Sequence, residues 1–295
     1  MINSLRHNFN QFKQAVFSYD TWELAAKLTL LLLLLSPVGN WYIRPLILSL
    51  CVSGLLISGM YRSRYLWGAL TLLTALRFYL AWPLSDNHAY LLSYWCLAFT
   101  ISAWLKDDTL LIKNAKYLLA FTFAFASWQK WSSVEYLNGV FFLITFILDD
   151  RFEDFVVLFS SITYEQIDTA RDYLEGDYRI TPAADKLPFT IPDSFWWLAI
   201  ASTIWNLFEQ LLIAIAFLAP KKSRLGQFRD PALLVFCFSI YAVVPVVSFG
   251  WMLIAMGIAQ SDKETPSIRL WYLFAFVTLI FYYEVPWADL ILEST

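Results

Sequence analysis

The residues in this sequence best suited to chemistry are a lysine, a histidine and a carboxylate that lie in or beside long apolar runs. Lys130 stands between two tryptophans at the end of "FASWQKW", His88 lies in "LSDNHAYLLSYW", and Glu209 lies in the middle of "STIWNLFEQLLIAIAF". A lysine at the edge of an apolar run is either an anchor at a membrane boundary or, where partial withdrawal from water lowers its pKa, a general base. Both interpretations stay open for Lys130.

His88 stands at the predicted start of a helix, directly after Ser85, Asp86 and Asn87, which are good helix-capping residues. The positive end of a helix favours the neutral imidazole, so His88 is either a neutral partner in a site or an ordinary interface residue. Helices joined by a short loop usually pack antiparallel. We therefore expect the helices at 88–105 and 116–131 to bring His88 and Lys130 to one mouth of the fold.

Glu209 needs a partner if it lies inside an apolar helix, because an isolated charge there is costly. Asn206 lies three residues earlier on the same face, and Arg77, in "LTALRFYLAW", is the most plausible counter-ion if the two helices touch. A structural ion pair and a functional site are both consistent with this pattern.

The composition is that of a membrane protein. Of 295 residues, 59% are hydrophobic and 15% are charged, whereas soluble domains carry about 25% charged residues. The net charge of -3 and the absence of a basic block predict no nucleic-acid partner. Three isolated cysteines and two histidines predict no metal site, and no GxSxG, HExxH, Walker or GxGxxG motif is present.

The apolar runs predict an all-α, polytopic transmembrane bundle of about eight spans. The segment 136–148 is short enough to be interfacial or re-entrant, although a ninth span is the alternative. Positive charges in the expected inner loops predict a cytoplasmic N-terminus. Residues 132–193 then form a small acidic extracytoplasmic cap, with eleven acidic residues from Asp149 to Asp193 and four basic residues, within a single domain 1–295. The eight predicted spans are 21–39, 43–60, 65–83, 88–105, 116–131, 194–219, 231–259 and 268–290.

Two segments resemble the membrane domain of vitamin K-dependent gamma-carboxylases, also called the horizontally transferred transmembrane domain. The first is "DNHAYLLSYWCLAF" with its Asn-His-x-Tyr-Leu pattern, and the second is "FASWQKWSSVEYLNGVFF", with a lysine followed by an aromatic segment that ends in glycine. Glu209 and the basic loop after it match more loosely, and the resemblance covers residues 20 to 260. The matching residues are Asn87, His88, Tyr90, Leu91, Lys130, Tyr136 and Gly139.

The resemblance implies a quinol-dependent and oxygen-dependent membrane enzyme. In that family the lysine matching Lys130 deprotonates a reduced naphthoquinone of the vitamin K or menaquinol type, the histidine matching His88 lies beside it, and a peptide glutamate is carboxylated. A dry pocket would protect such chemistry. Besides Lys130 and His88 as catalytic residues, the implied site has a substrate or quinone pocket of Asn87, Tyr90, Trp128, Trp131 and Tyr136, with buried polar support from Arg77, Asn206 and Glu209.

The sequence departs from the carboxylase pattern in ways that leave catalysis open. The spacing from lysine to glycine is about one residue longer than expected, the later apolar run offers Tyr241 in place of a histidine, and the large extramembrane domain that holds the peptide is missing. The alternative is a non-catalytic membrane factor for the maturation, export or immunity of a small secreted peptide, with small-molecule transport third. In each case we expect an integral membrane protein, in contact with lipid, in a bacterial inner membrane.

Overall fold

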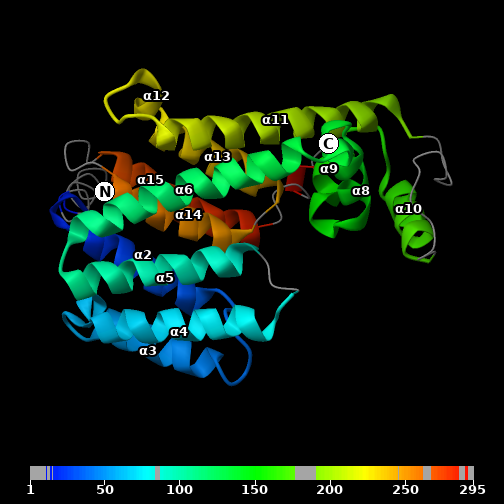
Figure 1. Ribbon diagram of the computed structural model, residues 1–295. Coiled ribbons are helices and arrows are strands. Elements are labelled where there is room, and N and C mark those ends of the chain that lie inside the picture. The colour runs from blue at the N-terminus through cyan, green and yellow to red at the C-terminus, as the bar shows by residue number, and fades with distance from the viewer. Residues whose placement is uncertain are drawn as a thin grey trace, which may run out of the picture.

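The computed structural model describes residues 11, 14, 16–83, 87–176, 191–244, 246–261, 267–285 and 290–291, and over these ranges all regular structure is helical. The helices form one elongated assembly with a small lobe at one end (Figure 1). In chain order they are α2 (Thr21–Leu35), α3 (Arg44–Leu56), η1 (Met60–Arg62), α4 (Arg64–Leu80), α5 (Asn87–Leu105), α6 (Asp108–Trp131), α7 (Val134–Leu137), α8 (Val140–Leu148), η2 (Asp150–Phe152), α9 (Glu153–Phe159), α10 (Tyr164–Gly176), α11 (Asp193–Leu218), α12 (Arg224–Gln227), α13 (Arg229–Val243), α14 (Val247–Gln260) and α15 (Ser267–Glu284).

The prediction of an eight-span transmembrane bundle is wrong, although the all-α class agrees with the described residues. Within the described part of the chain, α11 alone combines the length and the apolar composition needed to cross a membrane. A span requires about 20 apolar residues. The sequence-based count therefore overestimated how many of the apolar runs continue as single long helices.

The apolar runs are interrupted sooner than composition suggests. The predicted span 21–39 ends at Leu35, where Ser36 and Pro37 follow, and 231–259 divides into α13 and α14 around residues 244–246. Helices of 13 to 15 residues, such as α2, α3, α13 and α14, rise only about 20–22 Å, which is less than the hydrocarbon thickness of about 30 Å. The longer α6 carries Asp108, Lys113, Lys116 and Lys130.

Helix α14 lies at the centre of the assembly, and every residue from Gly250 to Gln260 is buried. It packs against α2, α6, α13 and α15, while α4, α5, α6 and α11 pack side by side in that order. Figure 1 shows α11 and α6 running along one side of α14, with α5, α4 and α3 on the other. This arrangement brings the end of α6 close to both α5 and α11.

Large apolar side chains cover much of the outer surface as well as filling the core. Among the described residues, eight of the exposed ones are tryptophans, and Trp41 has 84% of its surface exposed. Soluble monomers seldom display such extensive apolar surface, which usually marks contact with a membrane or a partner. The exposed tryptophans are Trp41, Trp82, Trp104, Trp128, Trp131, Trp197, Trp205 and Trp271.

The predicted acidic cap at 132–193 corresponds partly to the small lobe. Helices α8 and α9 pack against the first half of α11, and α10 packs against α8 and α9, around a separate apolar cluster that includes Phe146 and Phe195. Arg171 holds the lobe together, because its guanidinium pairs with Asp150, Glu153 and Asp168. Residues 177–190 of the predicted cap lie outside the described residues, and the placement of the lobe relative to a membrane stays a prediction.

Gly139, the glycine of the second motif, begins α8 with a left-handed backbone (φ +81). A Cβ atom there would lie 2.6 Å from Cδ1 of Ile200 on α11. We expect Gly139→Ala to lower the free energy of unfolding by about 1–3 kcal/mol, because the left-handed conformation and the contact both disfavour a side chain. Chemical denaturation measures this change.

Gly59→Ala is the matched control for Gly139→Ala. Gly59 also has a positive φ (+77), but a Cβ there would meet nothing within 4 Å. This control isolates the backbone cost, so equal losses for the two variants would contradict a steric role for Ile200.

Candidate active site

A cleft of about 600 Å³ opens between α5, α6, α11 and α14. One wall comes from the first two turns of α5, with Asn87, His88 and Tyr90, and the facing wall comes from the last four turns of α6, ending at Lys130. Gln210 of α11 and Phe249 of α14 complete the lining. The two residues that the sequence singled out as catalytic therefore line one cleft, as the antiparallel packing of the two helices predicts.

Lys130 lies in the last turn of α6 and turns away from the exposed tryptophans beside it. Its Nζ donates hydrogen bonds to Oδ1 of Asn206 at 2.6 Å and to Oε1 of Gln210 at 2.8 Å. The same Nζ lies 5.3 Å from the ring centroid of Tyr136. The hydrogen-bond partners of the amine in the described residues are therefore neutral amides, and none is a carboxylate.

The surroundings of Lys130 favour release of its proton. Burial lowers the pKa of the Lys130 amine to about 8, because removal from water disfavours the charged form. The two amide oxygens oppose this effect, since they accept hydrogen bonds from the ammonium. Near pH 8 the amine is thus divided between its charged and neutral forms, which suits a general base.

His88 lies one residue inside the start of α5, in accordance with the predicted helix boundary. Its ring packs against Phe249 of α14 in a tilted arrangement, with ring centroids 4.2 Å apart and an interplanar angle of 32°. The imidazole lines the Lys130 cleft on one side and a second, smaller cavity on the other. Packing against Phe249 fixes the ring plane, so that His88 presents a defined edge to each space.

The remaining predicted pocket residues divide into two groups. Asn87 and Tyr90 line the cleft. Tyr136 is buried beneath Lys130, and its hydroxyl has no hydrogen-bond partner in the described structure. Trp128 and Trp131 do not line the cleft, because their side chains are 72% and 62% exposed on the outer surface.

The three residues predicted to give buried polar support lie in different surroundings. Asn206 contacts Lys130 directly, but Glu209, on the neighbouring face of α11, accepts a hydrogen bond from Ser239 of α13 at 2.9 Å. Arg77 lies near the end of α4 and lines the smaller cavity with His88. The structure therefore does not bring Arg77 and Glu209 together as an ion pair.

Two site residues were missed from the sequence. Gln210 follows Asn206 by four residues, which is the spacing that places two side chains on one helix face, so periodicity offered a signal for it. Phe249 is one of 25 phenylalanines, and nothing in its local sequence indicates that it stacks on His88.

An aromatic pocket of about 220 Å³ lies on the other side of Asn206 from the cleft lining. Four phenylalanines of the lobe and Trp205 line it together with aliphatic residues of α13, and its polar residues are Ser202, Asn206 and Ser239. This pocket extends the apolar environment of the site towards the lobe. The four phenylalanines are Phe142, Phe146, Phe152 and Phe155.

The sequence resemblance predicts the head of a reduced naphthoquinone as the ligand of this site. Such a head is a flat apolar ring system with two hydroxyl groups, and the cleft offers aromatic walls from Phe121, Phe125 and Phe249 together with the amine of Lys130 and the imidazole of His88. Among the described residues, no group of three or more His, Cys, Asp or Glu is placed to hold a metal ion.

Comparison of the chain with protein-family models, with curated proteins and with solved structures finds no match. The resemblance to the carboxylase membrane domain therefore depends on the two short motifs and on the cleft that their residues line.

Proposed function

We propose that the chain is a quinol-dependent enzyme in which Lys130 acts as the general base on a reduced naphthoquinone held in the cleft. The observation that carries this proposal is the amine of Lys130 in a cleft with His88, hydrogen-bonded to neutral amides. An anchoring lysine would extend towards water or headgroups. Lys130 instead turns inward to Asn206 and Gln210.

The residues around the amine of Lys130 have distinct roles in this proposal. Lys130 removes a hydroxyl proton from the bound quinol, and Asn206 and Gln210 hold Nζ in place before and after the transfer. His88, fixed by Phe249, orients the ligand by a hydrogen bond from the other wall. The aromatic walls exclude water from the reacting atoms. The chemistry that the bound quinol supplies, once deprotonated, is its reaction with dioxygen.

The direct test is to incubate the purified protein with a reduced naphthoquinone and oxygen and to measure quinone epoxide by chromatography. We expect epoxide in proportion to enzyme, together with saturable quenching of tryptophan fluorescence by the quinone. Bound quinone without epoxide would contradict the catalytic proposal. The protein would then bind quinone without catalysing its epoxidation.

The pH dependence provides an independent prediction. The rate should rise as pH increases towards 8 and level off above it, because the neutral amine of Lys130, with its pKa lowered to about 8 by burial, is the active form. Gln210→Leu removes an acceptor that stabilises the ammonium, so the pKa falls further. We expect the rising limb to move to lower pH by roughly 1 unit, since hydrogen bonds to charged groups are worth about 1.5–3 kcal/mol.

Asn114→Leu serves as the control for the pH profile. Asn114 also lies on α6, but its amide bonds to the carbonyl of Leu110, well away from the cleft. Its profile should coincide with that of the wild type, and an equal displacement would show that the effect is not specific to Lys130.

The second candidate function is a non-catalytic factor for the maturation, export or immunity of a small secreted peptide. The lobe favours it, because Glu165 and Asp172 are exposed there, take no part in the Arg171 ion pairs and would attract a basic peptide. If this role is correct, Glu165→Lys with Asp172→Lys should abolish peptide maturation while Lys130→Met leaves it intact. The quinol proposal predicts the opposite result, in which Lys130→Met abolishes activity and the double variant of the lobe keeps it.

The location at a membrane is part of the proposal. The exposed tryptophans and other apolar side chains would lie against lipid or at its boundary, where amphipathic rings are stable. A naphthoquinone is itself lipid-soluble, so a cleft beside such a surface can receive it from the bilayer. A bacterial inner membrane with the N-terminus in the cytoplasm remains the expected location.

A further inference from the structure

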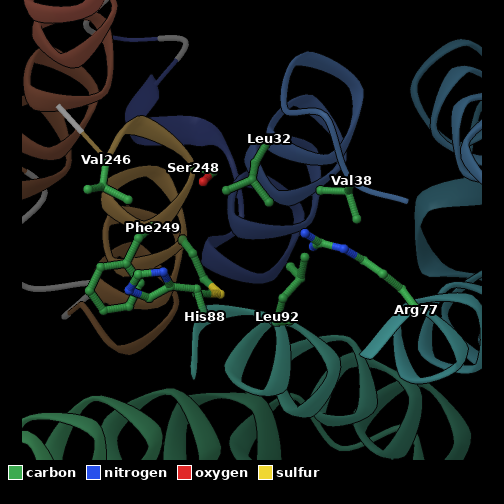
Figure 2. A pocket seen from close by; sticks show the side chains of 10 residues that line it. Leu32, Val38, Arg77, His88, Leu92, Val246, Ser248 and Phe249 are labelled. Atoms are coloured by element: carbon green, nitrogen blue, oxygen red, sulfur yellow. The ribbon is translucent and has the colours of Figure 1, made fainter. Parts of the chain in front are cut away.

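A small cavity of about 130 Å³ lies on the far side of His88 from the Lys130 cleft. It is enclosed by residues of α2, α4, α5 and α14 and by Val38 after α2. Figure 2 shows Arg77 reaching in from α4, with its guanidinium between Val38 and Leu92, while His88 and Phe249 form the opposite end. The side chains between these two ends are apolar except for Ser248.

Arg77 is the unusual member of this lining. Its side chain is half-buried, and its guanidinium has no hydrogen bond or ion pair with any described residue. Among the described residues around the cavity, none is acidic, and the other polar side chains are His88 and Ser248. A partly buried guanidinium without a partner loses part of its hydration, and its five donors match a planar oxyanion.

We propose that this cavity is a binding site for a small carboxylate-type anion, with Arg77 as the bidentate partner and Ser248 and His88 as additional polar contacts. The volume holds only a few heavy atoms, because a water molecule in the liquid occupies about 30 Å³. Arginine binds planar carboxylates through two parallel N–H···O bonds, which gives geometric selectivity. The site shares the rings of His88 and Phe249 with the Lys130 cleft, but its principal contact, Arg77, lines this cavity and not the cleft.

Another role for Arg77 is purely structural. Arg77 lies in the last turn of α4, where a positive charge stabilises the negative end of the helix. This role requires a charge but no anion, and lysine would fill it as well as arginine. The two roles therefore predict different effects of Arg77→Lys, and of an added anion, on the stability of the protein.

The test uses sodium acetate as the probe and the purified full-length protein. Acetate is titrated at constant ionic strength, with sodium chloride as the reference, and its binding is followed by saturation-transfer NMR of the methyl group and by the midpoint of thermal unfolding. We expect saturable binding and a rise in the midpoint for the wild type. Arg77→Gln should weaken binding by at least about tenfold, the amount expected for loss of charge-assisted hydrogen bonds.

Two further variants make the result decisive. Arg64→Gln removes an arginine from the first turn of the same helix, outside the cavity, and should bind acetate like the wild type. Arg77→Lys keeps the charge but loses the planar fork, so it should retain the unfolding midpoint in chloride and lose most of the acetate effect. If Arg77→Gln does not fold, Ser248→Leu, which obstructs the cavity while Arg77 remains, should also abolish binding.

Three outcomes would contradict the proposed anion site. A wild type with no saturable acetate effect, or an undiminished effect in Arg77→Gln or in Ser248→Leu, would assign Arg77 to the end of α4 alone.

Discussion

Lys130→Met is expected to abolish quinone epoxide formation while leaving the folded protein intact. General bases contribute about 10²- to 10⁴-fold to rate, so epoxide should fall by at least 100-fold. Methionine keeps an unbranched chain of similar length in the same space, and Asn206 and Gln210 lose only the amine that donates to them. Initial rates with saturating reduced naphthoquinone measure the effect, and quenching of tryptophan fluorescence shows that the ligand still binds.

Lys113→Met is the matched control for this prediction. Lys113 lies on the same helix, α6, but its side chain is exposed and remote from the cleft. We expect it to keep the rate of the wild type. Full activity in Lys130→Met would exclude Lys130 as the base, and equal losses in both variants would point to damage along α6.

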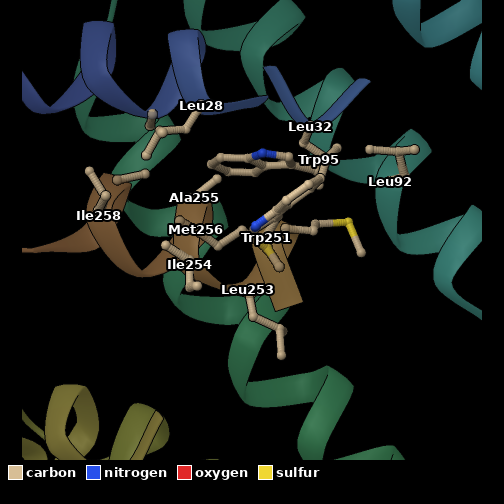
Figure 3. Close-up of a cluster of buried hydrophobic side chains, with 14 of the residues drawn as sticks. Leu28, Leu32, Leu92, Trp95, Trp251, Leu253, Ile254, Ala255, Met256 and Ile258 are labelled. Carbon is tan, nitrogen blue, oxygen red and sulfur yellow. The ribbon is translucent and has the colours of Figure 1, made fainter. Parts of the chain in front are cut away.

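Trp95→Ala is expected to have the largest effect on stability. Figure 3 shows Trp95 in the centre of the buried cluster, close to Trp251 and among apolar side chains of α14. Trp95 is fully buried, and its Nε1 donates a hydrogen bond of 2.9 Å to Oγ1 of Thr29 on α2. The substitution leaves a large cavity, so we expect a loss of about 3–5 kcal/mol in the free energy of unfolding.

The comparison for Trp95→Ala is Trp104→Ala on the same helix. Trp104 is 56% exposed and contacts Arg64 through a cation–π interaction, an interaction worth about 0.5–1 kcal/mol at an exposed site. Chemical denaturation of both variants should therefore give losses that differ several-fold. If Trp95→Ala cost as little as Trp104→Ala, the packing of α5 against α2 and α14 would not be the main support of the fold.

Local sequence predicts the start of α5 and the end of α6 well, because both boundaries depend on near neighbours. Helix α5 begins at Asn87, one residue before the predicted start at His88, and α6 ends at Trp131, where the predicted span also ends. Antiparallel packing of the two helices then brings His88 and Lys130 to one cleft. The motif glycine, Gly139, likewise stands where a left-handed residue is needed.

The number of membrane spans could not be predicted from local sequence. Apolar composition measures how many side chains avoid water, but it does not distinguish a core from a lipid-facing surface, and it places helix ends poorly within an apolar run. The division of 231–259 into α13 and α14 is an example. The long predicted spans fail because the helices end where the backbone turns to pack, as at Ser36 and Pro37 after α2.

By itself, the sequence determined the helical class within the described residues, the high apolar content and the placement of His88 and Lys130 along one cleft, since these follow from local propensity and chain order. Only the tertiary structure decided which polar groups meet. Lys130 bonds to Asn206 and Gln210, Glu209 turns to Ser239, and Arg77 lines a separate cavity. The physical reason is that partner choice depends on the rotation of each helix about its axis, which the packing of distant side chains fixes.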